Sequence, residues 1–322
     1  MRLPKTKRRG SGTHSVSTKS HFILAVDPFV ESRYQVNAFH LVKILQHHTH
    51  CTIEPVFVLG SSGRGFMLSK DDLQHWLPLT ETAFSKLLKK FNSINLAPPK
   101  ILIQKSPFLR MDVEALVSYA KSKSANAIIA GAQMKGAFER GFLGSFAETL
   151  ILYSAVPVIA VPPKSKLRNA LSPILFPTDF GRESSAAFDR CVTFAKTLGA
   201  RVVLLHQYSS PHFVYPEGVL KKDDKTWKKV STKDVPYLGK AKLLEQWKNK
   251  AIRSGVQCST KLTMQSINIA DVILSECKSA SYGLIAMGAT RGPGKAWFTG
   301  STPRWVLRHA RYPVWVYYNP VR

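Results

Sequence analysis

The stretches HFILAVD at residues 21–27 and ILFPTDF at residues 174–180 decide the fold, because each is a short apolar run that reaches an aspartate. Continuous apolar runs of this length are typical of strands buried on both faces of a parallel sheet. A helical pattern follows each stretch, and a second apolar run follows each helix, at 56–59 and at 202–205. The two stretches therefore open two halves of the chain that repeat one order of signals.

The rest of each half continues this alternation of strand and helix. The expected elements come in pairs, one from each half: helices over 81–91 and 240–253, strands over 101–103 and 258–262, helices over 112–123 and 269–278, strands over 127–130 and 284–287, and last strands over 157–161 and 313–317. The pattern predicts an α/β fold of two tandem doubly wound parallel-sheet domains. We expect a flexible basic tail over 1–20, domains over 21–163 and 170–320, and a Pro/Lys linker over 162–166.

Two segments, 60–79 and 207–237, fall outside the repeat. Both follow the second strand of their half, where open α/β sheets accept insertions near the end that binds ligands. We expect them to be exposed connectors. A role as lids or as partner surfaces stays open as the alternative.

The candidate site lies where the strands meet glycine-rich loops. Asp27 and Asp179 end the first strands, and both fourth strands run into a loop rich in glycine, over 131–144 and over 288–300. Ligands of open parallel sheets bind at the carboxyl ends of the strands, where glycine lets the backbone approach a phosphate and the next helix offers free N–H groups. The structural alternative is that the glycines permit tight turns and that Ser145 and Ser301 cap the following helices.

Several stretches of the second half together resemble the universal stress protein family: ILFPTDF at 174–180, AMGATRG at 286–292, GS at 300–301 and VLRHARYPV at 306–314. The resemblance extends over almost the whole chain, because each half resembles one copy of the family domain. It implies the universal stress protein fold, which is adenine nucleotide alpha hydrolase-like, with the last strands of the two halves paired as a pseudo-dimer. It also implies a non-enzymatic stress-response or regulatory protein that binds ATP or another adenine nucleotide with magnesium, with slow hydrolysis at most.

Carried onto this chain, the resemblance assigns the nucleotide to residues from both halves. These are Pro177, Thr178, Asp179, Met287, Gly288, Arg291, Gly292, Gly300, Ser301 and Thr302 in the second half, and Asp27, Gly131, Gly144 and Ser145 in the first. Both loops depart from the family pattern, because Met134 and Arg291 occupy the position of the second glycine. A methionine there crowds the phosphate path, whereas an arginine can pair with a phosphate. We therefore rank the second half above the first as a nucleotide site.

Composition bounds the remaining possibilities. The 322 residues are 44% hydrophobic and carry a formal net charge of +26, part of it in the tail and part in 221–233. This charge attracts polyanions, so a nucleic-acid-binding module is the competing function, and a ligand-free interaction scaffold is the third. No apolar stretch near the start is long enough for a signal peptide or a membrane span, and the four cysteines lack C-x-x-C spacing, so we expect a cytoplasmic protein.

Other constellations favour structural roles. His47, His48 and His50 lack regular metal-ligand spacing, and we expect solvated histidines and no metal site. The adjacent pair Asp71 and Asp72 does not suggest acid–base chemistry, and no catalytic constellation emerges. We expect the tryptophans of the second half to serve core or interface packing. We also expect whole chains to form a homodimer.

Overall fold

The computed structural model describes residues 20–60, 69–131, 145–208, 236–263, 267–289 and 301–319. The first half contains β1 (Ser20–Ala25), a 3-10 turn (Ser32–Tyr34), α1 (Val36–His48), β2 (Cys51–Gly60), α2 (Lys70–Lys89), β3 (Lys100–Gln104), α3 (Leu109–Ser122), β4 (Ala127–Gly131), α4 (Ser145–Tyr153) and β5 (Val158–Val161). The second half contains β6 (Ile174–Pro177), α5 (Arg182–Leu198), β7 (Val202–Gln207), α6 (Pro236–Arg253), β8 (Cys258–Thr263), α7 (Ile269–Ser279), β9 (Leu284–Ala289), α8 (Ser301–His309) and β10 (Val314–Tyr318).

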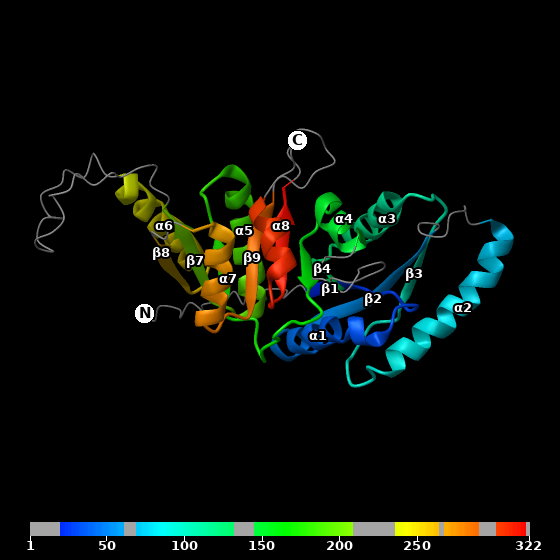
Figure 1. Cartoon of the computed structure of the whole chain (residues 1–322). Helices are drawn as coiled ribbons and strands as arrows, with labels where there is room; N and C mark the ends of the chain where they lie inside the picture. The colour runs from blue at the N-terminus through cyan, green and yellow to red at the C-terminus, as the bar shows by residue number, and fades with distance from the viewer. Residues whose placement is uncertain are drawn as a thin grey trace, which may run out of the picture.

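All these strands join one ten-stranded sheet in the order β3-β2-β1-β4-β5-β10-β9-β6-β7-β8. Every neighbouring pair within a half is parallel, and only β5 and β10 pair antiparallel. Each half is therefore a five-stranded doubly wound unit, and the two units meet at their last strands (Figure 1). The predicted fold class and the predicted pseudo-dimer are confirmed.

Helices cover both faces of this sheet. Buried side chains of α1, α2, α5 and α6 belong to one hydrophobic cluster, and those of α3, α4, α7 and α8 belong to the other. Along β1 the residues alternate between the clusters: Phe22 and Leu24 face one side, whereas Ile23 and Ala25 face the other. The apolar runs of the sequence are continuous because both sides of the central strands are buried.

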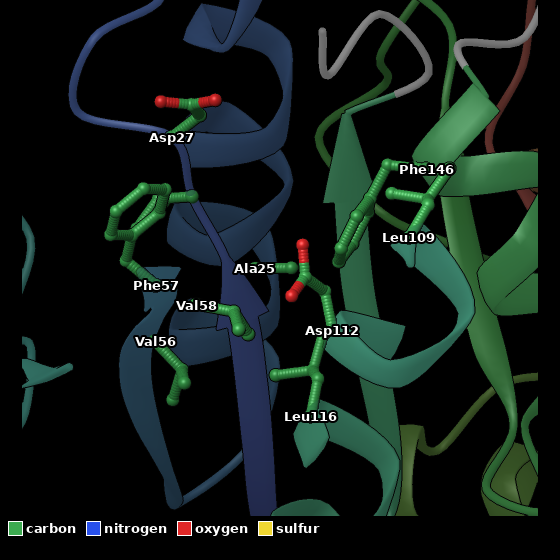
Figure 2. A pocket seen from close by; sticks show the side chains of 10 residues that line it. Ala25, Asp27, Val56, Phe57, Val58, Leu109, Asp112, Leu116 and Phe146 are labelled. Atoms are coloured by element: carbon green, nitrogen blue, oxygen red, sulfur yellow. The ribbon is translucent and has the colours of Figure 1, made fainter. Parts of the chain in front are cut away.

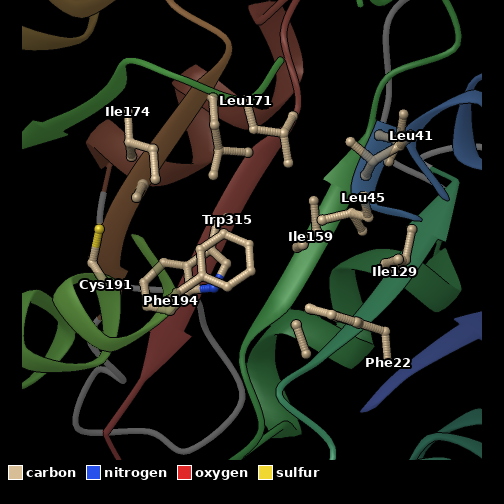
Figure 3. Close-up of a cluster of buried hydrophobic side chains, with 14 of the residues drawn as sticks. Phe22, Leu41, Leu45, Ile129, Ile159, Leu171, Ile174, Cys191, Phe194 and Trp315 are labelled. Carbon is tan, nitrogen blue, oxygen red and sulfur yellow. The ribbon is translucent and has the colours of Figure 1, made fainter. Parts of the chain in front are cut away.

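The seam between the halves is built into the core. Trp315 on β10 lies opposite Ile159 on β5 in the antiparallel register, and its side chain is fully buried. Its ring stacks on Phe194 of α5 with ring centroids 6.1 Å apart, and Phe194 in turn meets Phe22 of β1 in an edge contact at 6.3 Å (Figure 3). A contact between β1 and α5 crosses from one half to the other, so the halves share one core.

The expected connector over 60–79 is wrong for its second part. Helix α2 begins at Lys70, far ahead of the predicted start at 81, and Ser69 caps it. The Ser69 Oγ accepts a hydrogen bond from the backbone N–H of Asp72, and the Asp72 carboxylate accepts one from the backbone N–H of Ser69. This capping box, which also explains the pair of aspartates, starts the helix early and outweighs Pro78 inside it. Residues 61–68 and most of 207–237 lie outside the described residues.

No helix within the described parts of the chain is long and apolar enough to cross a bilayer.

Candidate functional site

The topology creates one crevice in each half. From β1 the chain crosses to β2 on one side, while β4 pairs with β1 on the other; β6 stands in the same way between β7 and β9. Such switch points are where open α/β sheets bind ligands. The last register pairs are Ala25 with Ala130 and Leu175 with Ile285. Both predicted aspartates follow the paired segments, at the end where β4 and β9 lead into the glycine loops.

In the second half, Asp179 opens a tight turn between β6 and α5. Its Oδ1 accepts hydrogen bonds from the backbone N–H of Gly181 at 2.8 Å and from the hydroxyl of Ser184 at 2.6 Å. Both of these hydrogen bonds go to Oδ1. The Asp179 side chain is otherwise exposed, so its carboxylate is open to a ligand.

The residue after Asp179 is held in an unusual backbone conformation. Phe180 has a φ of 63°, in the left-handed region that side chains other than glycine seldom adopt. Its ring packs on His206 at 4.7 Å and on Trp247 at 5.4 Å, and the Lys240 ammonium lies 5.4 Å from its centroid. This packing fixes the turn that presents Asp179. Strained residues of this kind cluster at functional sites.

Two titratable groups at this turn have displaced pKa values. Partial burial disfavours the charged form of Asp179, but the hydrogen bonds from Ser184 and Gly181 favour it more, so the pKa of its carboxyl lies below the usual value. Burial lowers the pKa of the His206 imidazole, whose Nδ1 lies 2.7 Å from the carbonyl oxygen of Thr178, and the Lys240 charge lowers that pKa further. Near neutral pH the turn therefore combines an ionised carboxylate with a neutral imidazole.

In the first half, Asp27 begins a similar turn but is enclosed. Its Oδ1 accepts a hydrogen bond from the backbone N–H of Phe29 at 3.0 Å, the counterpart of the Gly181 contact. Gln35 grips the backbone of Asp27 from both sides: its Oε1 accepts from the Asp27 N–H at 3.0 Å, and its Nε2 donates to the Asp27 carbonyl at 2.7 Å. Asp27 is 1% exposed and Gln35 is 3% exposed.

The first-half crevice is narrow and acidic. A cavity of about 20 Å³, room for roughly one water molecule, lies between β1, β2, α3 and α4. Asp27 and Asp112 both contribute to its lining, together with apolar side chains such as Val58 and Phe146 (Figure 2). Asp112 lies so close to Gly60 that a Cβ at residue 60 would stand 2.1 Å from its Oδ1. Two carboxylates in one small cavity are unfavourable for an anionic nucleotide.

The first glycine of each loop has a different structural setting. A Cβ at Gly288 would meet the Glu183 carbonyl oxygen at 3.1 Å and the Ala187 Cβ at 3.2 Å, so β9 needs a glycine there for close packing against α5. A Cβ at Gly131 would meet only the Tyr34 carbonyl oxygen, at an ordinary 3.5 Å. Gly288 thus has a packing role within β9, which differs from the tight-turn role that the structural alternative gives to the glycines.

The other predicted site residues divide into two groups. Pro177 is the last residue of β6, Thr178 follows it, and Met287 and Gly288 lie near the end of β9. Ser145 is the first residue of α4, while Ser301 and Thr302 open α8. Gly144, Arg291, Gly292 and Gly300, together with Met134, lie outside the described residues.

The structure adds four polar residues that sequence analysis missed: Gln35, Asp112, Ser184 and His206. Ser184 carried a readable signal, since a hydroxyl five residues after an aspartate can reach back across a tight turn into a helix. No sequence signal identified Gln35, Asp112 or His206, because the residues that they contact lie on other elements or across a loop.

The histidines and tryptophans for which the sequence favoured structural roles make the following contacts. His48 Nε2 lies 2.7 Å from the carbonyl oxygen of Asn169, and the rings of His47 and His48 touch. Among the residues that the structure describes, no group of histidine, cysteine or acidic side chains could hold a metal ion. Trp315 is a core residue and Trp247 stacks on Phe188, as the packing hypothesis predicted, whereas Trp305 is 45% exposed. The basic segments 1–19 and 221–233 lie outside the described residues.

Comparisons with known proteins agree with this architecture. The sequence matches the model of the Universal stress protein family over residues 102–162 and 171–317. A universal stress protein structure from Archaeoglobus fulgidus DSM 4304 aligns with a TM-score of 0.62 at 17% identity, covering 94% of this chain and 99% of that chain. A structure from Pseudomonas aeruginosa UCBPP-PA14 aligns with a TM-score of 0.55 at 12% identity, covering 93% of each chain.

A shorter family protein from Arabidopsis thaliana, whose structure has AMP bound, covers 46% of this chain and 92% of its own at 18% identity, with a TM-score of 0.33. A search of the curated proteins found no sequence match.

Proposed function

Since the chain belongs to the universal stress protein family, we propose that it is a non-enzymatic stress-response or regulatory protein that holds an adenine nucleotide in its second half. The nucleotide is ATP or a related adenine nucleotide with magnesium. The nucleoside lies at Asp179, and the phosphates reach toward the start of α8 at Ser301. The protein binds the nucleotide and does not turn it over at an appreciable rate.

One observation carries this proposal: the turn at the switch point between β6 and β9 holds the Asp179 carboxylate through hydrogen bonds to Oδ1 and leaves the residue exposed. A carboxylate fixed in this way can accept a hydrogen bond from a ribose hydroxyl or an adenine amino group. Ser301 begins a helix, whose first N–H groups favour phosphate. The first half offers a cavity of about 20 Å³ with two carboxylates in its lining, which is a poor match for the same ligand.

The test is a calorimetric titration of ATP and AMP, with magnesium, at two salt concentrations. The informative variant is Ser301→Asp, which places a negative charge where a phosphate would lie. Ser145→Asp is its matched control, because Ser145 holds the same position at the start of α4. Aspartate in a first turn suits the helix dipole, so neither change should harm folding.

We expect saturable binding that persists at high salt, weakens about tenfold or more in Ser301→Asp, as expected from loss of one charge-assisted contact and added repulsion, and is unchanged in Ser145→Asp. Loss in Ser145→Asp alone would assign the nucleotide to the first half and contradict the proposal. Binding that fades with salt in all three proteins would mean that the net positive charge alone attracts the nucleotide. That outcome would contradict the proposal and favour an interaction scaffold without a nucleotide site.

A further inference from the structure

A second, larger hollow lies away from both switch points. It runs between α7 and α8 and has a volume of about 470 Å³. Its lining residues are Lys166, Asp271, Leu274, Lys278, Trp305, His309, Arg311 and Tyr312. None of these residues belongs to the predicted nucleotide site. We call this hollow the Trp305 groove; its volume is within the range of pockets that hold small molecules, roughly 300 to 1,000 Å³.

A fixed but accessible indole forms one end of the Trp305 groove. The Trp305 ring stacks on His309 with centroids 4.1 Å apart and planes 27° apart, and its Nε1 donates a hydrogen bond to Asp271 at 3.1 Å. The side chain nevertheless remains 45% exposed. A ring held by two contacts and left open to solvent is ready to stack on a planar ligand, with little further loss of rotamer freedom.

The other end of the Trp305 groove carries positive charge without acidic partners. Lys166, Lys278 and Arg311 are all exposed, and none of them forms an ion pair with a described acidic residue. Asp271, the acidic residue of the lining, is at the opposite end and accepts the indole hydrogen bond. The groove therefore has an aromatic end and a cationic end.

The linker between the halves completes the cationic end. The backbone N–H of Lys166 donates to the carbonyl oxygen of Arg311 at 2.6 Å, which fixes the linker against the turn that follows α8. A single half without this linker would lack Lys166. The Trp305 groove is thus a product of joining two halves in one chain.

Spacing along the helices indicates the length of a fitting ligand. Asp271 and Lys278 lie about two helical turns apart on α7, which is about 10 Å along its axis. Trp305 lies on α8, and Arg311 follows two residues after the end of that helix. A ligand that stacks on the indole and pairs with the cations must therefore carry a planar ring and an anionic group roughly 10 Å apart.

We propose that the Trp305 groove binds a small phosphate-bearing ligand with a planar ring, the ring against Trp305 and the phosphate between Lys278, Arg311 and Lys166. This site is independent of the nucleotide site proposed above, because it shares no residue with it. The groove volume of about 470 Å³ suits a ligand whose ring has two or three fused cycles.

Flavin mononucleotide is a suitable probe, because stacking on an indole quenches flavin fluorescence. Riboflavin supplies the ring without the phosphate, and inorganic phosphate supplies the anion without the ring. The charge variant is Lys278→Gln with Arg311→Gln. Its matched control is Lys100→Gln with Arg253→Gln, which removes the same charge from exposed positions on β3 and α6. Trp305→Leu tests the stacking contact.

We expect saturable quenching by the full chain, with affinity about tenfold or more lower in the charge variant, in Trp305→Leu and for riboflavin, and unchanged within about twofold in the control pair. Inorganic phosphate should compete only at much higher concentration. Equal weakening in the charge variant and in the control pair would mean that the overall positive charge of the protein attracts the ligand, and this would overturn the proposal. Equal affinity for riboflavin, full binding by Trp305→Leu, or no quenching at all would overturn it as well.

Discussion

The two halves of the sheet begin their candidate sites with the same turn and finish them differently. In both, an aspartate after the first strand accepts a hydrogen bond from the backbone N–H two residues later, at Phe29 and at Gly181. In the first half Gln35 then seals the backbone of Asp27 inside the protein. In the second half, Phe180 adopts a left-handed backbone conformation and α5 begins two residues later, at Arg182. Asp179 stays exposed in this short turn.

Under the proposed function, this difference separates a structural role in the first half from a binding role in the second. The first half uses its buried aspartate and the clamp from Gln35 to stabilise the start of the domain. The second half keeps an accessible carboxylate at the price of an unfavourable φ at Phe180. Three further measurements sharpen or break this division.

The largest effect is expected at the clamp. Gln35→Ala leaves the buried N–H of Asp27 unsatisfied and leaves its carbonyl oxygen with only the hydrogen bond from the Val30 N–H at 3.2 Å, which should lower the free energy of unfolding by about 2 to 3 kcal/mol. Ser184→Ala, which removes the second-half contact to an exposed carboxylate, should cost no more than about 1 kcal/mol. Urea unfolding measures both. Equal costs would show that the two aspartates have the same structural weight.

An intermediate effect is expected at the paired glycines. Gly288→Ala forces a Cβ against the Glu183 carbonyl oxygen and Ala187, and should destabilise the protein by about 1 to 2 kcal/mol. Gly131→Ala meets only an ordinary contact and should change stability by less than about 0.5 kcal/mol in the unfavourable direction, or increase it. Thermal unfolding distinguishes them. A larger loss at Gly131 would mean that the first loop, not the second, needs its glycine for packing.

Much of this architecture could be predicted from the sequence, because its signals are local. The apolar runs ending in Asp27 and Asp179 identified both first strands, and the alternation of elements predicted two doubly wound halves paired at 157–161 and 313–317. Helix α2 was predicted to start too late, because its start depends on a reciprocal cap between Ser69 and Asp72 and its interior contains Pro78.

The site was harder to predict, because burial is not a local property. Asp27 and Asp179 look equivalent in sequence, and only the fold shows that Gln35 encloses one of them. Asp112 enters the first crevice from α3, and only the packing of that helix against Gly60 places it there. His206 is the last example: it lies one position before the end of β7 and meets the Thr178 carbonyl through the neighbouring strand.

The smallest effect is expected from the titration of His206. Because burial lowers the pKa of its imidazole in the folded state, the unfolded chain takes up the proton first as pH falls below about 6.5. The contribution of His206 to stability is therefore complete above that pH and decreases as pH falls toward the lowered pKa, by less than about 1 kcal/mol. His206→Gln should flatten the curve of unfolding free energy against pH in this window, whereas His40→Gln, at an exposed position on α1, should leave it unchanged. An identical curve for wild type and His206→Gln would mean that the second-half turn does not favour the neutral imidazole, and would remove one of the features that distinguish it from the first half.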